Sequence, residues 1–191
     1  MKGVYIFIAE GFEDVEALGT NDVLRRGGVD VKLVSITDEL FSQSSRGITI
    51  STDACLEDLE TSHEGTDEKD FMIFPGGMPG TKNLAACKPL MELMQAHYDA
   101  GGSVAAICAA PGLVLSQLRG IEGAEFTCFE GFQSYTEAKG AKFIAKPAVK
   151  SGRIITGRSA GHALAFGEEI LRVIAPEKVR DVDYGMFLDT E

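Results

Sequence analysis

The stretch from Ser103 to Leu115 constrains the fold of this chain most. A short apolar run leads to one cysteine, Cys108, which is followed by small residues, a proline and a second apolar segment. The pattern predicts a buried strand, a tight turn at Cys108 and a helix over residues 113–118. A cysteine between a strand and a helix is typical of a nucleophile elbow, in which the turn lifts a reactive side chain out of the sheet.

Two interpretations of Cys108 are open at this point. Cysteine often packs as a small apolar side chain, so a structural thiol is the first. The second is a reactive thiol. A helix N-terminus would stabilise its thiolate, and free backbone N–H groups, including that of Ala109, would hold an oxyanion. The order of strand, cysteine, small residues and proline favours the reactive thiol.

The rest of the chain alternates apolar runs with amphipathic segments. Such runs are typical of strands buried on both faces, and the segments between them of helices. The alternation predicts an α/β sandwich, a mostly parallel sheet with helices on both faces, formed by residues 1–191 as a single domain. The expected strands are 4–9, 29–36, 71–74, 103–107, 141–150 and 153–156, with a hairpin in 42–51, and the expected helices are 14–26, 89–100 and 163–174.

Composition narrows the partners and the compartment. The 191 residues carry a formal net charge of −11 without a Lys/Arg block, which argues against nucleic acid or an anionic membrane as a partner. No apolar run is long enough for a transmembrane helix, and no targeting segment is recognisable, so we expect a cytoplasmic protein. The four cysteines form no CxxC pair and do not combine with the three histidines at zinc-ligand spacings, so we expect reduced thiols and no metal.

Glu16 is the candidate acid partner of Cys108. Sites in parallel sheets lie at the carboxyl ends of the strands, where the first helix begins. A carboxyl group buried beside a thiolate would have a raised pKa and would donate a hydrogen bond to sulfur. A solvated helix glutamate is the simpler interpretation, and Glu10, Glu13 and Asp14 are close competitors.

Two further positions are candidates for the same edge of the sheet. Gly77 ends the segment Pro75–Gly77 after an apolar strand, and its N–H would complete an oxyanion hole with that of Ala109, although an ordinary turn would look the same. His162 opens the last long helix directly after a strand. A cysteine hydrolase needs a base, and His162 is the histidine whose position fits a cleft.

Three segments resemble the signatures of the ThiJ/PfpI superfamily. They are EGFEDVE at 10–16, FPGG at 74–77 and AAICAAP at 105–111. Similarity runs from Val4 to about Ile174, and the nearest branch contains the Parkinson-disease-associated protein and bacterial ThiJ-type proteins. The resemblance implies a flavodoxin-like fold of the class I glutamine amidotransferase type, usually as a homodimer that uses the surface near Arg26 and Arg46.

The resemblance also implies a site and a choice of activities. Cys108 would be the oxidisable thiol, Glu16 its protonated partner, and Gly77 and Ala109 the donors of N–H groups. The activity would be that of a glyoxalase or protein deglycase on methylglyoxal or its adducts, without a metal or organic cofactor. Its partners would be a small aldehyde or a glycated protein. The alternative is a non-enzymatic oxidative-stress sensor or chaperone, and a cysteine peptidase or amidase is a third.

One departure from the family pattern affects these hypotheses. The Parkinson-associated branch has a histidine near the thiol about twenty residues after the cysteine, but residues 126–130 of this chain, FTCFE, have none. Peptidase chemistry by a Cys–His pair is therefore disfavoured unless His162 replaces the missing base. Cys128 in this segment suggests a resolving thiol for oxidised Cys108, subject to disulfide geometry.

Overall fold

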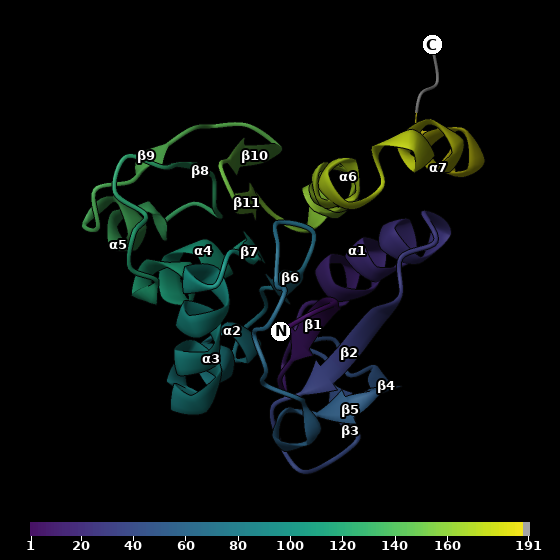
Figure 1. The fold of residues 1–191 in the computed structure, drawn as a ribbon, viewed down its shortest axis with the longest axis horizontal. Helices are drawn as coiled ribbons and strands as arrows, with labels where there is room; N and C mark the ends of the chain where they lie inside the picture. The colour runs from purple at the N-terminus through teal and green to yellow at the C-terminus, as the bar shows by residue number, and fades with distance from the viewer. Residues whose placement is uncertain (189–191) are drawn as a thin grey trace.

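The core of the protein is a seven-stranded sheet with helices packed on it. The computed structural model describes residues 1–188. Its strands follow the order β10-β11-β7-β6-β1-β2-β5, and all neighbours are parallel except β10 and β11 (Figure 1). The strands are β1 (Val4–Ile8), β2 (Val31–Ser35), β5 (Ala54–Cys55), β6 (Phe71–Phe74), β7 (Ser103–Ile107), β10 (Ala148–Ser151) and β11 (Ile154–Gly157).

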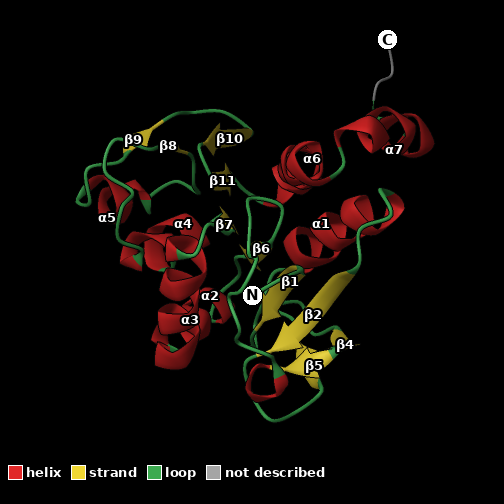
Figure 2. Ribbon diagram, in the orientation of Figure 1, coloured by secondary structure: helices red, strands yellow, loops and turns green. Residues whose placement is uncertain are grey.

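Helices cover both faces of this sheet and complete a three-layer α/β/α sandwich (Figures 1 and 2). Alternate residues of a buried strand point to opposite faces, so Ile6 and Ile8 pack in one apolar cluster and Phe7 in another. The predicted flavodoxin-like fold is confirmed. One face carries α1 (Asp14–Arg26), α6 (Ala163–Ile174) and α7 (Val179–Met186), and the other carries α2 (Gly80–Ala86), α3 (Lys88–Asp99) and α4 (Ala110–Leu113).

Helix α1 follows its sequence signals at both ends. Glu13 is the N-cap, and its side chain accepts a hydrogen bond from the backbone N–H of Glu16 at 2.8 Å. Gly27 follows the last residue, and a methyl group there would lie 2.4 Å from a methyl carbon of Leu171. The glycine therefore ends α1 and also lets α6 pack closely against it.

The helix after Cys108 differs from the expected one. Helix α4 ends at Leu113, and a 3-10 turn, Leu115–Gln117, continues the chain in place of a helix over 113–118. The Ser116 hydroxyl donates to the carbonyl oxygen of Gly112 at 2.5 Å, which competes with regular helical bonding. A helix of one turn has little macrodipole, so any stabilisation of a Cys108 thiolate must come from individual N–H groups.

The shorter elements lie around the edges of the sheet. The expected hairpin is present and consists of β3 and β4. The expected strand 141–150 is divided between two partners: Lys142–Phe143 pairs with β8 (Glu125–Phe126), and Ala148–Ser151 pairs with β11. Helix α7 packs on the domain through Val179 and Val182. These elements are β3 (Phe41–Gln43), β4 (Thr49–Ser51), β8 (Glu125–Phe126), β9 (Lys142–Phe143), α5 (Gln133–Glu137) and the 3-10 turns Leu56–Asp58, Ala160–His162 and Pro176–Lys178.

Within residues 1–188, no helix combines the length and apolar character that crossing a membrane requires.

Candidate active site

Cys108 lies at the turn between β7 and α4, in the geometry of a nucleophile elbow. Its φ angle is 65°, a left-handed conformation that is unusual for a residue with a side chain. Two backbone hydrogen bonds hold it: Cys108 N–H donates to Gly157 O at 3.0 Å, and Phe129 N–H donates to Cys108 O at 2.8 Å. The side chain is half-buried, so the thiol faces a cleft while its backbone is fixed on both sides.

The Glu16 carboxyl group is buried next to this thiol. Glu16 lies in the first turn of α1 and is only 1% exposed. Its Oε2 accepts a hydrogen bond from the backbone N–H of Gly76 at 2.7 Å. Its other oxygen, Oε1, is buried and has no partner of good hydrogen-bond geometry among the described residues, although the Cys108 thiol is close enough to change the pKa of the carboxyl group.

Two consecutive glycines let the backbone approach this pair. A methyl group on Gly76 would lie 2.5 Å from Glu16 Oε2 and 2.7 Å from Cys108 Cβ. Gly77 has a φ of 93°, and a methyl group there would lie 2.4 Å from the backbone nitrogen of Glu13. The N–H groups of Gly77 and Ala109 both lower the pKa of the Cys108 thiol, so they lie close enough to its sulfur to stabilise a negative charge there. The fold thus brings together four of the six candidate residues: Cys108, Glu16, Gly77 and Ala109.

The thiol and the carboxyl group titrate as a pair. Burial raises the pKa of Glu16 to about 7, although the Cys108 thiol and the Gly76 N–H act in the opposite direction. Burial also raises the pKa of the Cys108 thiol, and the Glu16 charge raises it further. Two negative charges this close repel each other, so the pair carries at most one negative charge near neutral pH. A Cys108 thiolate is therefore compatible only with a protonated Glu16.

A cleft of about 300 Å³ opens over the Cys108 thiol. Arg46 lines one side of it, because Ser45 N–H donates to Phe12 O at 2.8 Å and holds the loop between β3 and β4 against the start of α1. Phe129 and Phe132 line the cleft as well. No sequence pattern pointed to these two aromatic residues, and the family resemblance placed Arg46 only on the surface of an expected dimer.

His162 and Cys128 do not join the cluster around the thiol. His162 Nδ1 lies 3.1 Å from the Ser159 hydroxyl, and the histidine is absent from the described lining of the cleft. The Cys128 side chain is fully buried with Phe126 and Ala141 in a separate apolar cluster. Burial, with a smaller contribution from the charge of Glu137, raises the pKa of Cys128 to about 12. These positions do not favour a rescuing base or a resolving thiol.

The competing carboxylates have other roles or positions. Glu10 accepts a hydrogen bond from the Gln43 backbone N–H at 2.9 Å, and Glu13 caps α1. The two carboxylate oxygens of Asp14 are buried and have no hydrogen-bond partner within the described part of the chain. Glu16 is the acidic residue whose pKa the Cys108 thiol affects.

A doubly wound α/β sandwich with a cysteine at its nucleophile elbow and a buried glutamate beside the thiol defines a class of cysteine-centred proteins. Comparison with known families places this chain within that class. The model of the DJ-1/PfpI family matches residues 2–173, so the chain belongs to the DJ-1/PfpI family.

Relatives and solved structures agree with this assignment. Protein DJ-1 homolog B of Arabidopsis thaliana is 32% identical over 182 residues, covering 95% of this chain and 40% of the relative. Glutathione-independent glyoxalase DJR-1.2 of Caenorhabditis elegans is 32% identical over 174 residues, covering 91% and 89%. The chain spans less than half the length of the two Arabidopsis relatives that it matches.

Two solved structures match nearly the whole fold. Drosophila melanogaster DJ-1beta has a TM-score of 0.86 at 26% identity and covers 97% of each chain. The oxidised DJ-1 of Toxoplasma gondii has a TM-score of 0.86 at 24% identity and covers 98% of each chain. The latter similarity supports the fold alone.

Proposed function

We propose that this protein is a cofactor-independent glyoxalase or protein deglycase that uses Cys108 as its nucleophile. The observation that carries the proposal is the convergence of the Cys108 sulfur, the Glu16 carboxyl group and two backbone N–H groups at one cleft. The name of the Caenorhabditis elegans relative supports the choice of reaction. The substrate would be methylglyoxal or the adducts that it forms on proteins.

The first step needs a thiolate and a proton donor. With the proton on Glu16 and the negative charge on sulfur, Sγ adds to the aldehyde carbon of methylglyoxal. The carbonyl electron pair moves to oxygen, and Glu16 transfers its proton to that oxygen to give a hemithioacetal. In support of this role, a proton on the buried Oε1 would turn an acceptor without a partner into a donor toward the substrate oxygen.

The second half of the reaction moves hydrogen within the substrate. The Glu16 carboxylate removes the proton from the former aldehyde carbon, which gives an enediolate. The hydroxyl proton on that carbon's oxygen moves to the former ketone oxygen, and Glu16 returns its proton to the neighbouring carbon, which gives the thioester of a 2-hydroxy acid. Water then hydrolyses the thioester to lactate and releases the thiol. The aldehyde carbon is oxidised while the ketone carbon is reduced, so no external oxidant is needed. The N–H groups of Gly77 and Ala109 would stabilise the oxyanions.

The experiment that tests this proposal measures lactate formation from methylglyoxal by wild type, Cys108→Ser and Glu16→Gln. Wild type should form lactate, and Cys108→Ser should not. Cys108 of Glu16→Gln should still react with alkylating reagents. The variant should convert methylglyoxal at least a hundredfold more slowly, since a general acid–base group typically raises a reaction rate about 10²- to 10⁴-fold. Equal turnover by wild type and Cys108→Ser would refute the proposal.

A second candidate function is oxidation sensing through Cys108. The same N–H groups and a protonated Glu16 would hold the oxygens of a sulfinate. The thiolate would react with one peroxide to give a sulfenate and with a second to give a sulfinate, releasing one water each time. A mass increase confined to Cys108 at low peroxide, without lactate formation, would favour this function over the enzyme.

We also propose a cytoplasmic homodimer formed through α1 and the hairpin of β3 and β4. Val15 on α1 and Ile48 beside the hairpin are both about half exposed, at 51% and 52%, and the two elements lie together through the contact of Ser45 with Phe12. Exposed apolar side chains on adjacent elements are typical of an interface. Light scattering of wild type and Ile48→Asp tests this, and a monomeric wild type would contradict it.

A further inference from the structure

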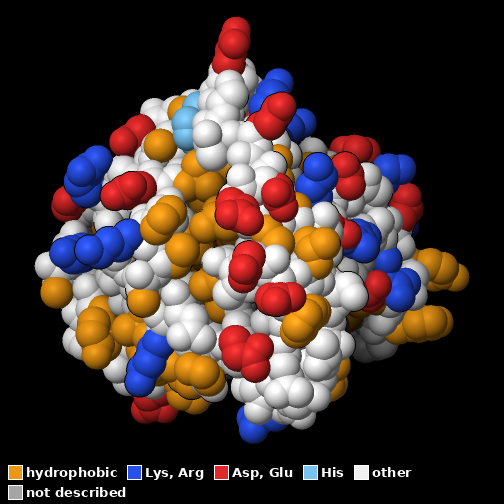
Figure 3. Space-filling view, turned by 90° about the horizontal axis from the view of Figure 1, so that it is seen from below, with side chains coloured by type: hydrophobic (Ala, Val, Ile, Leu, Met, Phe, Trp, Pro, Cys, Tyr) orange, Lys and Arg blue, Asp and Glu red, His pale blue; other side chains and the backbone are white. Residues whose placement is uncertain are grey.

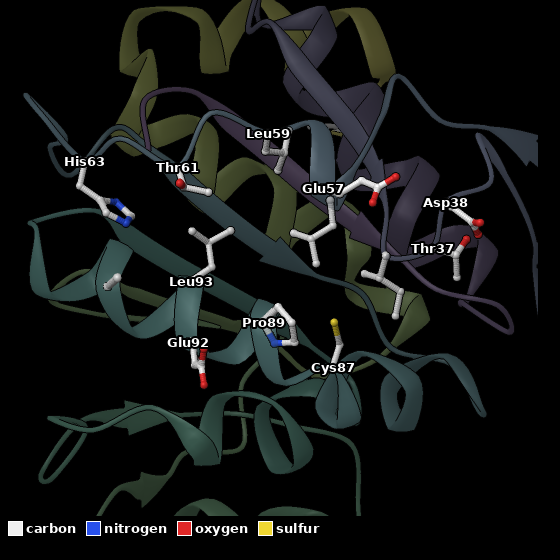
Figure 4. Close-up of a pocket in the computed structure, with 13 residues that line it drawn as sticks. Thr37, Asp38, Glu57, Leu59, Thr61, His63, Cys87, Pro89, Glu92 and Leu93 are labelled. Atoms are coloured by element: carbon white, nitrogen blue, oxygen red, sulfur yellow. The ribbon is translucent and has the colours of Figure 1, made fainter.

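A second, larger cavity lies outside the Cys108 cleft and shares no residue with it. It measures about 700 Å³, within the range of small-molecule sites. It lies between the start of α3 on one side and the segments after β2 and β5 on the other. Figure 4 shows Cys87, Pro89 and Leu93 on the α3 side, facing Thr37, Glu57 and Leu59.

The floor of this cavity is apolar and its walls are held by local structure. Leu93 is nearly buried, and Ile36, Leu56 and Leu59 are half-buried, so each leaves part of its side chain open to the cavity. Asp58 fixes the loop wall by accepting a hydrogen bond from the Cys55 backbone N–H at 3.3 Å. This contact ties the loop wall to the end of β5.

The charged side chains that line the cavity are all acidic, although the N-terminal ammonium group of Met1 lies 2.6 Å from Nδ1 of the lining residue His63. Asp38, Glu57 and Glu92 belong to its lining, and none of them forms an ion pair in residues 1–188. His63 adds no positive charge at neutral pH, because burial lowers its pKa below the ordinary value. Figure 3 shows the face below the view of Figure 1, where acidic side chains lie among apolar ones.

From this arrangement we infer that the cavity binds an amphipathic organic cation, a small molecule with an apolar body and a protonated amine. The apolar floor would bury the body, and the three carboxylates would hold the amine at the rim. A neutral compound of the same shape would lose the charge interactions, and an anion would be repelled. The inference does not depend on the function of Cys108, because the two sites are separate.

The test uses three fluorescent probes that differ mainly in the end of one chain: dansylcadaverine with an ammonium group, N-pentyl dansylamide with a methyl group and 6-(dansylamino)hexanoate with a carboxylate. Dansyl emission rises in apolar surroundings, so titration gives each dissociation constant. We expect dansylcadaverine to bind about tenfold more tightly than the neutral probe. High salt should reduce this difference in affinity, because it screens the charge interactions. Equal binding of all three probes, or no saturable binding below about millimolar concentration, would overturn the inference.

Charge variants test the rim of the cavity. The triple variant Asp38→Asn, Glu57→Gln and Glu92→Gln should abolish the preference for the cation while the neutral probe still binds. A matched triple variant removes the same charge from exposed acidic residues that do not line the cavity. The assignment would be contradicted if the triple variant of the lining residues still preferred the cationic probe to the neutral one. It would also be contradicted if the matched control variant lost this preference to the same extent. The control changes are Glu122→Gln, Glu125→Gln and Glu177→Gln.

A filled cavity tests the location. Ala96 is exposed on α3 and lines the cavity, so Ala96→Phe should weaken binding of every probe at least tenfold without affecting Cys108. If that variant does not fold, alkylation of Cys87 fills the same space in the natural sequence. Bound dansylcadaverine should also slow the alkylation of Cys87, followed by mass spectrometry. Binding that leaves Cys87 fully reactive would place the probe elsewhere and refute the site.

Discussion

Replacing Glu16 by glutamine should change how the stability of the protein depends on pH. The folded state raises the pKa of Glu16 from 4.5 to about 7. The folded protein therefore binds more protons than the unfolded chain between these two values, and its free energy of unfolding falls as the pH rises through this range. Glutamine does not ionise, so the variant lacks this part of the pH dependence.

The size of the effect follows from the shift. A change of one pKa unit corresponds to about 1.4 kcal/mol, so the full shift is worth about 3 kcal/mol. Between about pH 5.5 and about pH 8.5, the linkage relation gives about 2 kcal/mol of this total. The free energy of unfolding of Glu16→Gln, minus that of wild type, should increase by this amount across the window. Groups that do not interact with Glu16 titrate alike in both proteins and cancel.

Urea unfolding at a series of pH values measures this difference. Glu122→Gln, which removes an exposed glutamate, serves as the control and should leave the difference from wild type constant. The variant can also differ from wild type by an amount that is the same at every pH. Such an offset, added to the change with pH, would reflect lost hydrogen bonds and would not bear on the argument. A difference that does not change with pH would refute the raised pKa of Glu16, and the proposed proton donor would lose its physical basis.

Three further outcomes are expected. Gly76→Ala should slow the alkylation of Cys108 and lower the free energy of unfolding by about 1–3 kcal/mol, because the new methyl group overlaps Glu16 Oε2; unchanged alkylation and urea unfolding would show that the backbone can move aside. Cys128→Ala should oxidise at Cys108 as fast as wild type, since the buried Cys128 thiol packs elsewhere; a Cys108–Cys128 disulfide found by mass spectrometry in peroxide-treated wild type would contradict this. Arg46→Ala should lower the rate of Cys108 alkylation by iodoacetate several-fold relative to iodoacetamide, because the guanidinium group attracts anions to the cleft, and Arg46→Lys should restore the ratio.

The sequence was informative where local rules decide the structure. Parallel strands are buried on both faces, so their apolar runs are continuous and easy to locate, and Gly27 marks the end of α1. The same logic located Cys108 at an elbow, since the strand before it and the small residues after it leave few alternatives. Glu16 was named through the family resemblance, and its burial beside the thiol follows from the packing of α1 on the sheet.

The remaining features depend on contacts between distant segments. The position of Arg46 follows from one hydrogen bond between Ser45 and Phe12, which no local pattern encodes. Phe129 reaches the cleft because its N–H pairs with the carbonyl of Cys108. The early end of α4 depends on a side-chain bond of Ser116, where propensity alone predicted a longer helix. The single-domain organisation and the dimer remain predictions.

The strained backbone of Cys108 has a consequence for synthesis on the ribosome. Its two hydrogen-bond partners, Phe129 and Gly157, lie 21 and 49 residues further along the chain, as their numbers show. A nascent or truncated chain that stops before Gly157 lacks β11 and cannot hold the left-handed turn. Its cysteine then has the reactivity of an ordinary thiol in a flexible peptide. The left-handed turn at Cys108 can therefore form only after most of the chain has been synthesised. In unfinished chains the site around Cys108 is not assembled.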